Sequence, residues 1–112
     1  MARPTDRRWS RHAREAAELL GREIRGARLA RGMPAAEVAE RAGVSRGLVQ
    51  RIEAGDSGVS LGAAFEVAAL LGVSIFEPEP AAFARRLAAA REKAPLLPEA
   101  ARPRRTLVKD DF

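Results

Sequence analysis

The chain has 112 residues, which is enough for one compact domain with flanking arms. It contains no cysteine, so disulfides and thiolate metal sites are excluded. The net charge of +5 suits a nucleic-acid partner, but residues 33–76 carry three basic and five acidic residues, so charge alone does not decide the function.

Apolar residues make up 46% of the chain but aromatic residues only 4%, and alanine, leucine, arginine and glutamate dominate. This composition favours helix over strand and predicts an all-α fold. No run of about 18 apolar residues is present, so we expect no membrane-spanning helix. The N-terminus is basic but lacks the apolar stretch of a signal peptide, and we expect a cytoplasmic protein.

The first predicted helix covers residues 10–31, because small and apolar residues recur three to four positions apart. These residues are Ala16, Leu20, Ile24 and Ala27. Gly32 is expected to end the helix. We divide this part of the chain into a basic N-terminal arm over residues 1–14, which includes the start of the predicted helix, and a helical domain over residues 15–76.

Two short helices are predicted next, over residues 35–42 and 46–54. Ser45 is the expected N-cap of the second, and Gly55 its end. A fourth helix follows Ser60, and its predicted buried face consists of Leu61, Ala64, Phe65, Ala68 and Leu71.

Residues 73–76 are short and partly β-branched, and a proline-containing run follows them, so no ordinary helix is expected there. A further helix is predicted within residues 77–93, with a narrow apolar stripe of Phe83, Leu87 and Ala90. Prolines and arginines then predict an extended or disordered tail over residues 94–112.

Residues 34–55 have the spacing of two short helices that cross steeply over a tight turn. Such a pair needs a small residue where the backbones approach, a glycine with positive φ, and branched apolar residues behind the second helix. The residues that fill these roles are Ala39, Gly43, Val44, Val49 and Ile52, with Val38 and Ala42 completing the inner face of the first helix.

The outer face of the second helix of this pair carries side chains suited to reading DNA bases. Arginine donates two hydrogen bonds to guanine, glutamine pairs with adenine, and leucine contacts the thymine methyl group. A glycine on this face would allow a close approach to the groove. The expected base-reading residues are Arg46, Gly47, Leu48, Gln50 and Arg51.

The segment from residue 20 to about residue 76 resembles the Cro and phage-repressor-like family of helix-turn-helix proteins, often called Xre. The motifs that carry the resemblance are LGREIR at 20–25, VAERAGVSR at 38–46, IEAG at 52–55 and AALLGVS at 68–74. The resemblance implies a five-helix fold with the third helix in the major groove. It also implies a partly buried ion pair between Arg28 and Glu53, the alternative being a solvated pair worth under about 1 kcal/mol.

The sequence departs from this family where phosphates are usually bound. Pro34 and Ala35 replace the hydroxyl cap and the glutamine at the start of the second helix, and the loop after the third helix contains Asp56. The helix starts at Ala35, Ala36 and Ser45 still offer backbone N–H groups to a phosphate. Further expected phosphate ligands are Arg22 and Arg25, together with Arg3, Arg7, Arg8 and Arg11 of the arm.

We therefore expect a homodimeric transcriptional repressor that binds double-stranded DNA and is not an enzyme, with no metal and no cofactor. His12 is the only histidine, and no serine has a base partner. The expected dimer seam is residues 73–76, with added apolar surface from Phe83 and Leu87. Trp9 is expected to pack on the domain rather than lie in a mobile arm.

The C-terminal tail leaves a second function open. Residues 93–112 resemble the tails of small Xre-type antitoxins that are paired with HipA-like kinase toxins, in which DNA binding serves autoregulation. A terminal aromatic residue, Phe112, would then anchor in the kinase. The alternatives are a disordered solubilising tail and a helical domain that acts only as a protein scaffold.

Overall fold

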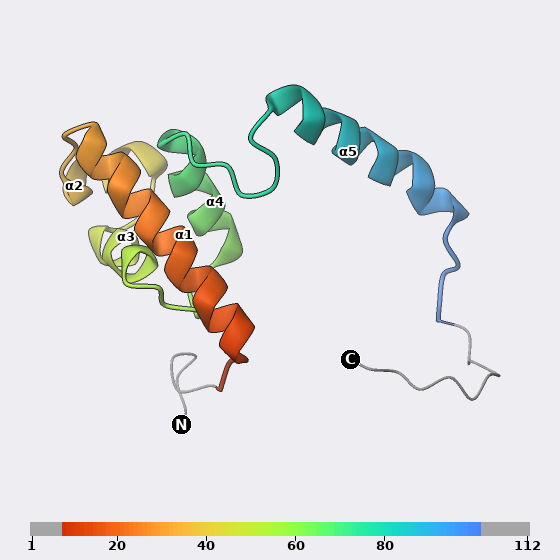
Figure 1. Cartoon of the computed structure of the whole chain (residues 1–112), viewed down its shortest axis with the longest axis horizontal. Coiled ribbons are helices and arrows are strands. Elements are labelled where there is room, and N and C mark those ends of the chain that lie inside the picture. The colour runs from red at the N-terminus through yellow and green to blue at the C-terminus, as the bar shows by residue number, and fades with distance from the viewer. Residues whose placement is uncertain (1–7, 102–112) are drawn as a thin grey trace. The chain divides into compact units, whose positions relative to one another are not determined.

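The computed structural model describes residues 8–101, and within them it contains five α-helices, one 3₁₀-helix and no β-strand. In chain order these are α1 (Arg11–Ala30), α2 (Ala35–Ala42), α3 (Arg46–Glu53), α4 (Leu61–Leu70), α5 (Pro80–Lys93) and η2 (Ala94–Leu96) (Figure 1). The predicted all-α, five-helix fold is confirmed. The chain divides into two compact units, of which the first ends at Pro78 and the second begins at Glu79.

Serine side chains fix where three helices of the first unit begin. Each serine Oγ accepts a hydrogen bond from the backbone N–H three residues further on, at 3.0 to 3.1 Å, which satisfies a donor that the helix cannot. The capping residues are Ser10, Ser45 and Ser60. The caps predicted at Ser45 and Ser60 are confirmed.

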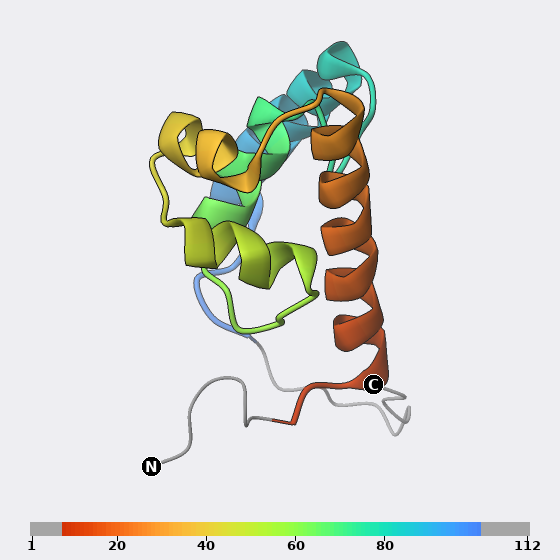
Figure 2. The ribbon, with the colours of Figure 1, turned by 90° about the vertical axis from the view of Figure 1, so that its left-hand side faces the viewer.

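The core of the first unit is made by aliphatic side chains from α1 to α4. Helix α1 packs against α3, and α2 packs against both α3 and α4 (Figure 2). Burying one such side chain fully contributes about 1.5 to 3 kcal/mol, so this cluster is the main source of stability. Its members are Ile24, Val38, Ala39, Val49, Ile52, Ala64, Val67, Ala68 and Leu71.

Two residues that were predicted to be buried are exposed. Leu61 and Phe65 of α4 are 69% and 36% exposed, whereas Val67, which was not predicted, is fully buried. Helix α4 is apolar on nearly every face, so its apolar spacing does not identify the face that packs. Ala16 is exposed because α1, at about 30 Å, is longer than the core that it covers.

After α4 the chain leaves the helical conformation, as predicted for residues 73–76. The Val73 N–H donates to the carbonyl of Ala68 at 2.8 Å, and the Val73 side chain packs against the core. Phe76 lies edge-to-face on Phe65, with ring centroids 6.2 Å apart. The two rings therefore cover each other at the surface of the first unit.

The second unit contains α5 and η2. Pro80 occupies the first turn of α5, where its missing N–H is tolerated, and no residue of α5 is buried. The predicted extended tail is wrong for Ala94–Leu96, which form a 3₁₀ turn, and residues 97–101 are irregular. The predictions for residues 102–112 lie outside the described residues. Within the described range, no helix is both long and apolar enough to cross a lipid bilayer.

Candidate nucleic-acid interface

The turn between α2 and α3 sets the angle between these helices. Gly43 ends α2 with φ 71° and ψ 31°, a left-handed conformation that glycine adopts without steric cost. The Val44 N–H donates to the carbonyl of Ala39 at 3.0 Å and closes the turn. Behind it, Val38 and Val49 are fully buried, so α2 and α3 are held against each other through a packed contact.

This packing leaves one face of α3 exposed to solvent. Val49 and Ile52 point into the core, and the opposite side of the helix carries no apolar side chain that the core uses. The residues exposed there are Arg46, Gly47, Gln50, Arg51 and Ala54. The face predicted to read bases is therefore accessible along the whole length of α3.

Gly47 and Leu48, two of the predicted base-reading residues, have different surroundings. A Cβ atom built on Gly47 would meet only the Ser45 Oγ, at 4.0 Å, so the fold does not require a glycine at this position. Leu48 is half-buried and packs against the core cluster. It lies at the edge of the exposed face, as predicted, with only part of its side chain accessible.

Arg51 is paired with the loop that follows α3. Its Nε donates to Asp56 Oδ2 at 2.8 Å, and the backbone N–H of Gly58 donates to Asp56 Oδ1 at 2.7 Å. The hydrogen bond from Arg51, and secondly that from Gly58, holds the pKa of Asp56 below its ordinary value. The acidic residue in this loop is thus neutralised by a base-reading candidate.

The structure brings the predicted pair Arg28 and Glu53 together. Arg28 Nε and Nη2 donate to the two Glu53 carboxylate oxygens at 2.6 and 3.0 Å, and Arg28 Nη1 donates to the Met33 carbonyl at 2.9 Å. The side chains are 12% and 9% exposed, so the pair is largely buried. The Glu53 hydrogen bond raises the pKa of Arg28 above its ordinary value. This bidentate pair fixes the end of α3 to α1.

Helix α1 also approaches the end of α3 through its backbone. A Cβ atom on Gly21 would collide with the carbonyl oxygens of Ile52 and Glu53. Gly55 has φ 80°, and a Cβ there would lie 3.1 Å from the Cα of Glu18. These contacts leave no room for a side chain and place the middle of α1 beside the end of α3.

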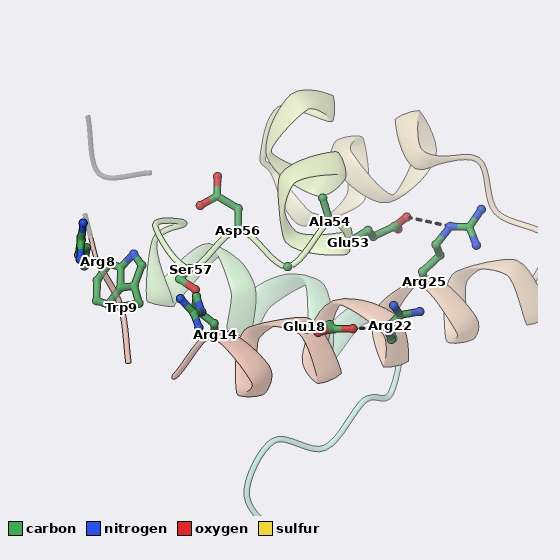
Figure 3. Close-up of a pocket in the computed structure, with 11 residues that line it drawn as sticks. Arg8, Trp9, Arg14, Glu18, Arg22, Arg25, Glu53, Ala54, Asp56 and Ser57 are labelled. Atoms are coloured by element: carbon green, nitrogen blue, oxygen red, sulfur yellow. Dashed lines mark hydrogen bonds and ion pairs between the residues drawn. The ribbon is translucent and has the colours of Figure 1, made fainter. Parts of the chain in front are cut away.

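A groove of about 860 Å³ runs between this part of α1 and the loop after α3 (Figure 3). Arginine side chains from α1 and from the segment before it line one wall, and residues 53–57 line the other. The arginines that line the groove are Arg8, Arg14, Arg22 and Arg25. The groove therefore brings the two predicted phosphate ligands of α1 next to the end of α3.

These arginines differ in how they are paired. Arg22 Nε donates to Glu18 at 2.9 Å, and Arg25 Nε lies 3.9 Å from Glu53, which is already engaged by Arg28. Arg11, also predicted as a phosphate ligand, donates to Glu15 at 3.2 Å. Within residues 8–101, Arg8 and Arg14 form no ion pair. Their positive charges stay available at the groove.

The start of α2 also has backbone groups that face solvent. Pro34 is the N-cap and makes no side-chain capping hydrogen bond, and its carbonyl accepts only the N–H groups of Glu37 and Val38. The N–H groups of Ala35 and Ala36 precede these and have no capping side chain. At the start of α3, by contrast, the Ser45 hydroxyl accepts the Leu48 N–H.

The remaining residues that the sequence analysis singled out are Trp9 and His12. Trp9 is half-buried and lines the groove, and His12 is exposed on α1. Across residues 8–101, no three histidine or acidic side chains are grouped in a way that could hold a metal ion. Arg3 and Arg7 lie outside the described residues.

Sequence reasoning missed three residues of this site. Arg14 lines the groove, Ala54 shares the outer face of α3 with Gly47, and Asp56 pairs with Arg51. The spacing of seven residues between Gly47 and Ala54 could have shown that both lie on one helix face. The Arg51 to Asp56 pair spans a helix end, where helical spacing no longer predicts neighbours.

Comparison with known families gives one match to this surface. A family model described as Helix-turn-helix matches residues 24–77, which include the end of α1 and all of α2, α3 and α4. No curated protein and no solved structure matches the chain.

Proposed function

Because residues 24–77 belong to the Cro and phage-repressor-like helix-turn-helix family, we propose that this protein is a sequence-specific transcriptional repressor that inserts α3 into the major groove of DNA. The family is DNA-binding and non-enzymatic. One observation carries the proposal. The outer face of α3 is exposed along its length and carries hydrogen-bonding side chains that the core does not use.

In this proposal Arg46, Gln50 and Arg51 read base edges. An arginine recognises guanine through N7 and O6, and a glutamine recognises adenine through N6 and N7. Gly47 lies between them on the helix surface and adds no side chain, so the backbone of α3 can approach the bases closely. Leu48 contacts a thymine methyl group with the exposed part of its side chain.

Phosphate contacts flank this face on two sides in the proposal. At the start of α2, the N–H groups of Ala35 and Ala36 point out of a helix N-terminus, which favours an anion, and the start of α3 behind Ser45 does the same. On the other side, Arg22 and Arg25 face the groove together with Arg14. Their charges supply the cationic groups that the loop containing Asp56 does not offer.

We further propose that the repressor is a homodimer whose two recognition helices lie about 34 Å apart, matching half-sites one DNA turn apart. Exposed apolar residues in each unit support a dimer interface. Ile75 and Phe76 are 39% and 58% exposed, and in the second unit Phe83 and Leu87 are 44% and 39% exposed. A second copy of the chain would cover them.

The test is selection of bound sequences from a random DNA pool. We expect a two-fold symmetric site, and we expect Arg46→Ala and Gln50→Ala each to reduce affinity for it by about 1 to 3 kcal/mol and to relax one base position per half-site. Arg85→Ala removes an equal charge from the side of α5 opposite Phe83 and should leave base preference intact. Equal binding of all sequences by the wild-type protein would refute the proposal.

Salt dependence separates the phosphate ligands from the base readers. Each arginine that neutralises a phosphate releases condensed counterions, so removing it lowers the slope of log affinity against log salt by about one. We expect this from Arg14→Ala and Arg25→Ala, with base preference unchanged. A variant that alters one base position instead would move that arginine to the base-reading set.

A second function, as the antitoxin of a HipA-like kinase, draws support from the second unit. Leu96 and Leu97 are 83% and 54% exposed, and α5 buries none of its residues, so this unit offers apolar surface to a partner. A neighbouring gene for such a kinase would favour this function. Deleting residues 106–112 should then weaken kinase binding and leave DNA affinity nearly unchanged.

A further inference from the structure

We propose that Asp56 is a specificity-determining positioning residue, whose carboxylate holds the Arg51 guanidinium in the orientation that reads a base. This inference rests on the proposed DNA-binding function. It assigns a role to the acidic residue of the loop that follows α3. The proposal follows from the hydrogen bonds, the exposure and the charge of the two side chains.

The hydrogen bond from Arg51 to Asp56 uses only the Nε of the guanidinium. Asp56 Oδ2 accepts from Arg51 Nε at 2.8 Å, and neither Nη group of Arg51 forms a hydrogen bond within residues 8–101. A guanidinium has five N–H donors in one plane, so the four on the Nη atoms remain available. Two parallel donors from such a fork match N7 and O6 of guanine.

Asp56 is itself fixed at three points, so it is a rigid support. Its Oδ1 accepts the Gly58 N–H at 2.7 Å, and its own N–H donates to the Arg51 carbonyl at 3.0 Å. Its side chain is 14% exposed, whereas that of Arg51 is 49% exposed. The carboxylate is thus largely shielded from solvent, whereas about half of the Arg51 side chain is exposed.

Holding an arginine in place matters because its side chain is flexible when free. A free arginine side chain samples many rotamers, and part of this conformational entropy is lost when it binds a base. An arginine that is already oriented loses less on binding, and it favours the base that fits its fixed plane. Arg46 on the same helix forms no ion pair within the described residues, so it serves as an internal comparison.

The charges of Asp56 and Arg51 also support this role of Asp56. A lone carboxylate close to the DNA backbone would repel phosphates, but the Arg51 guanidinium neutralises that of Asp56 at 2.8 Å. The pair presents the Arg51 donors to the major groove of DNA, and the charge of the Asp56 carboxylate behind them is neutralised. This explains how the loop tolerates an acid at the DNA surface.

Asp56→Asn separates the two hydrogen bonds of the carboxylate. The two bonds use different carboxylate oxygens, and an amide has only one oxygen. With that oxygen on the Gly58 N–H, the amide NH2 faces the Arg51 Nε, and two donors cannot form a hydrogen bond. We expect about a tenfold loss of preference at one base pair of each half-site, with the preference read by Arg46 unchanged. In an Arg51→Ala background the same substitution should cause no further loss at that base pair.

Arg51→Lys provides a second measurement that does not depend on Asp56. It keeps the positive charge but lacks the planar fork, and we expect it to lose the same base-pair preference. Unchanged preference in Asp56→Asn, or a uniform gain in affinity at all sequences, would overturn the role of Asp56. A wild-type protein without any base preference would overturn the DNA-binding function together with this inference.

Discussion

The two units of the chain contrast in what holds their helices. Helices α1 to α4 share a core of nine buried residues, and three of them begin at a serine that caps the first turn. Helix α5 also carries apolar residues at helical spacing, but it buries none of its residues and Glu79 makes no side-chain cap. An apolar stripe therefore contributes to a core only where its residues become buried, and in α5 Phe83 and Leu87 remain 44% and 39% exposed.

The largest expected effect on the free energy of unfolding comes from shortening one apolar side chain in each unit to alanine. Ile24 is fully buried and Leu87 is 39% exposed. We expect Ile24→Ala to destabilise the first unit by about 3 to 5 kcal/mol, because it removes packed atoms and leaves a cavity. Leu87→Ala should change the unfolding free energy by less than about 0.5 kcal/mol. Urea unfolding followed by circular dichroism measures both, and equal losses would show that α5 shares in the core.

The buried ion pair should give the next largest effect. Arg28→Met leaves Glu53 buried without its main partner, and we expect a loss of about 3 kcal/mol. Arg22→Met is the matched control, because its pair with Glu18 is exposed and is worth under about 1 kcal/mol. Thermal unfolding of the two variants measures the difference. Similar melting temperatures would mean that the pair at the end of α3 is as solvated as a surface pair.

Removing a helix cap should change the stability of the two units by different amounts, but by less than the loss of the buried ion pair. Ser60→Ala removes the side-chain acceptor of the Ala63 N–H, and we expect a loss of about 1 kcal/mol from the first unit. Glu79→Ala removes no capping hydrogen bond and should not change the unfolding curve. If Glu79→Ala reduced stability as much as Ser60→Ala, the start of α5 would be held by interactions comparable to a cap.

The smallest expected effect depends on pH and concerns Asp56. Its pKa in the folded protein lies below the ordinary value of 3.8, so the charged carboxylate stabilises the fold above that value. This contribution is lost as pH falls through the folded pKa. We expect wild-type protein to exceed Asp56→Asn in unfolding free energy by under about 1 kcal/mol at pH 7. The gap should close as pH falls below 3.8 and through the lowered pKa of Asp56, and a gap that widened in acid would contradict this sign.

The helix boundaries were predictable because local signals agreed with one another. Residues 35–42 and the start of α3 behind Ser45 follow from a small set of capping and turn residues, of which Gly43 is the clearest. The inner face of this helix pair was also predictable, since Val38 and Val49 lie on apolar faces of helices whose opposite faces carry charged side chains. Contacts close in sequence determine each of these features.

The sequence could not identify the features that depend on distant contacts. The buried face of α4 includes Val67 rather than Leu61, because α2 determines which side of this uniformly apolar helix is covered. The groove depends on how α1 crosses the end of α3, which is set by backbone contacts at Gly21. Asp56 reaches Arg51 only because Gly55, with φ 80°, turns the chain back.

Gly47 has a consequence for how this protein could be retargeted. The position has open space around it, so alanine or serine would fit, and alanine would raise helix propensity by about 1 kcal/mol. Its neighbours Arg46 and Gln50 likewise contribute no atom to the core. The residues at positions 46, 47 and 50 can therefore be replaced without disturbing the core. A library of variants at these three positions should yield stable proteins that prefer new DNA sequences.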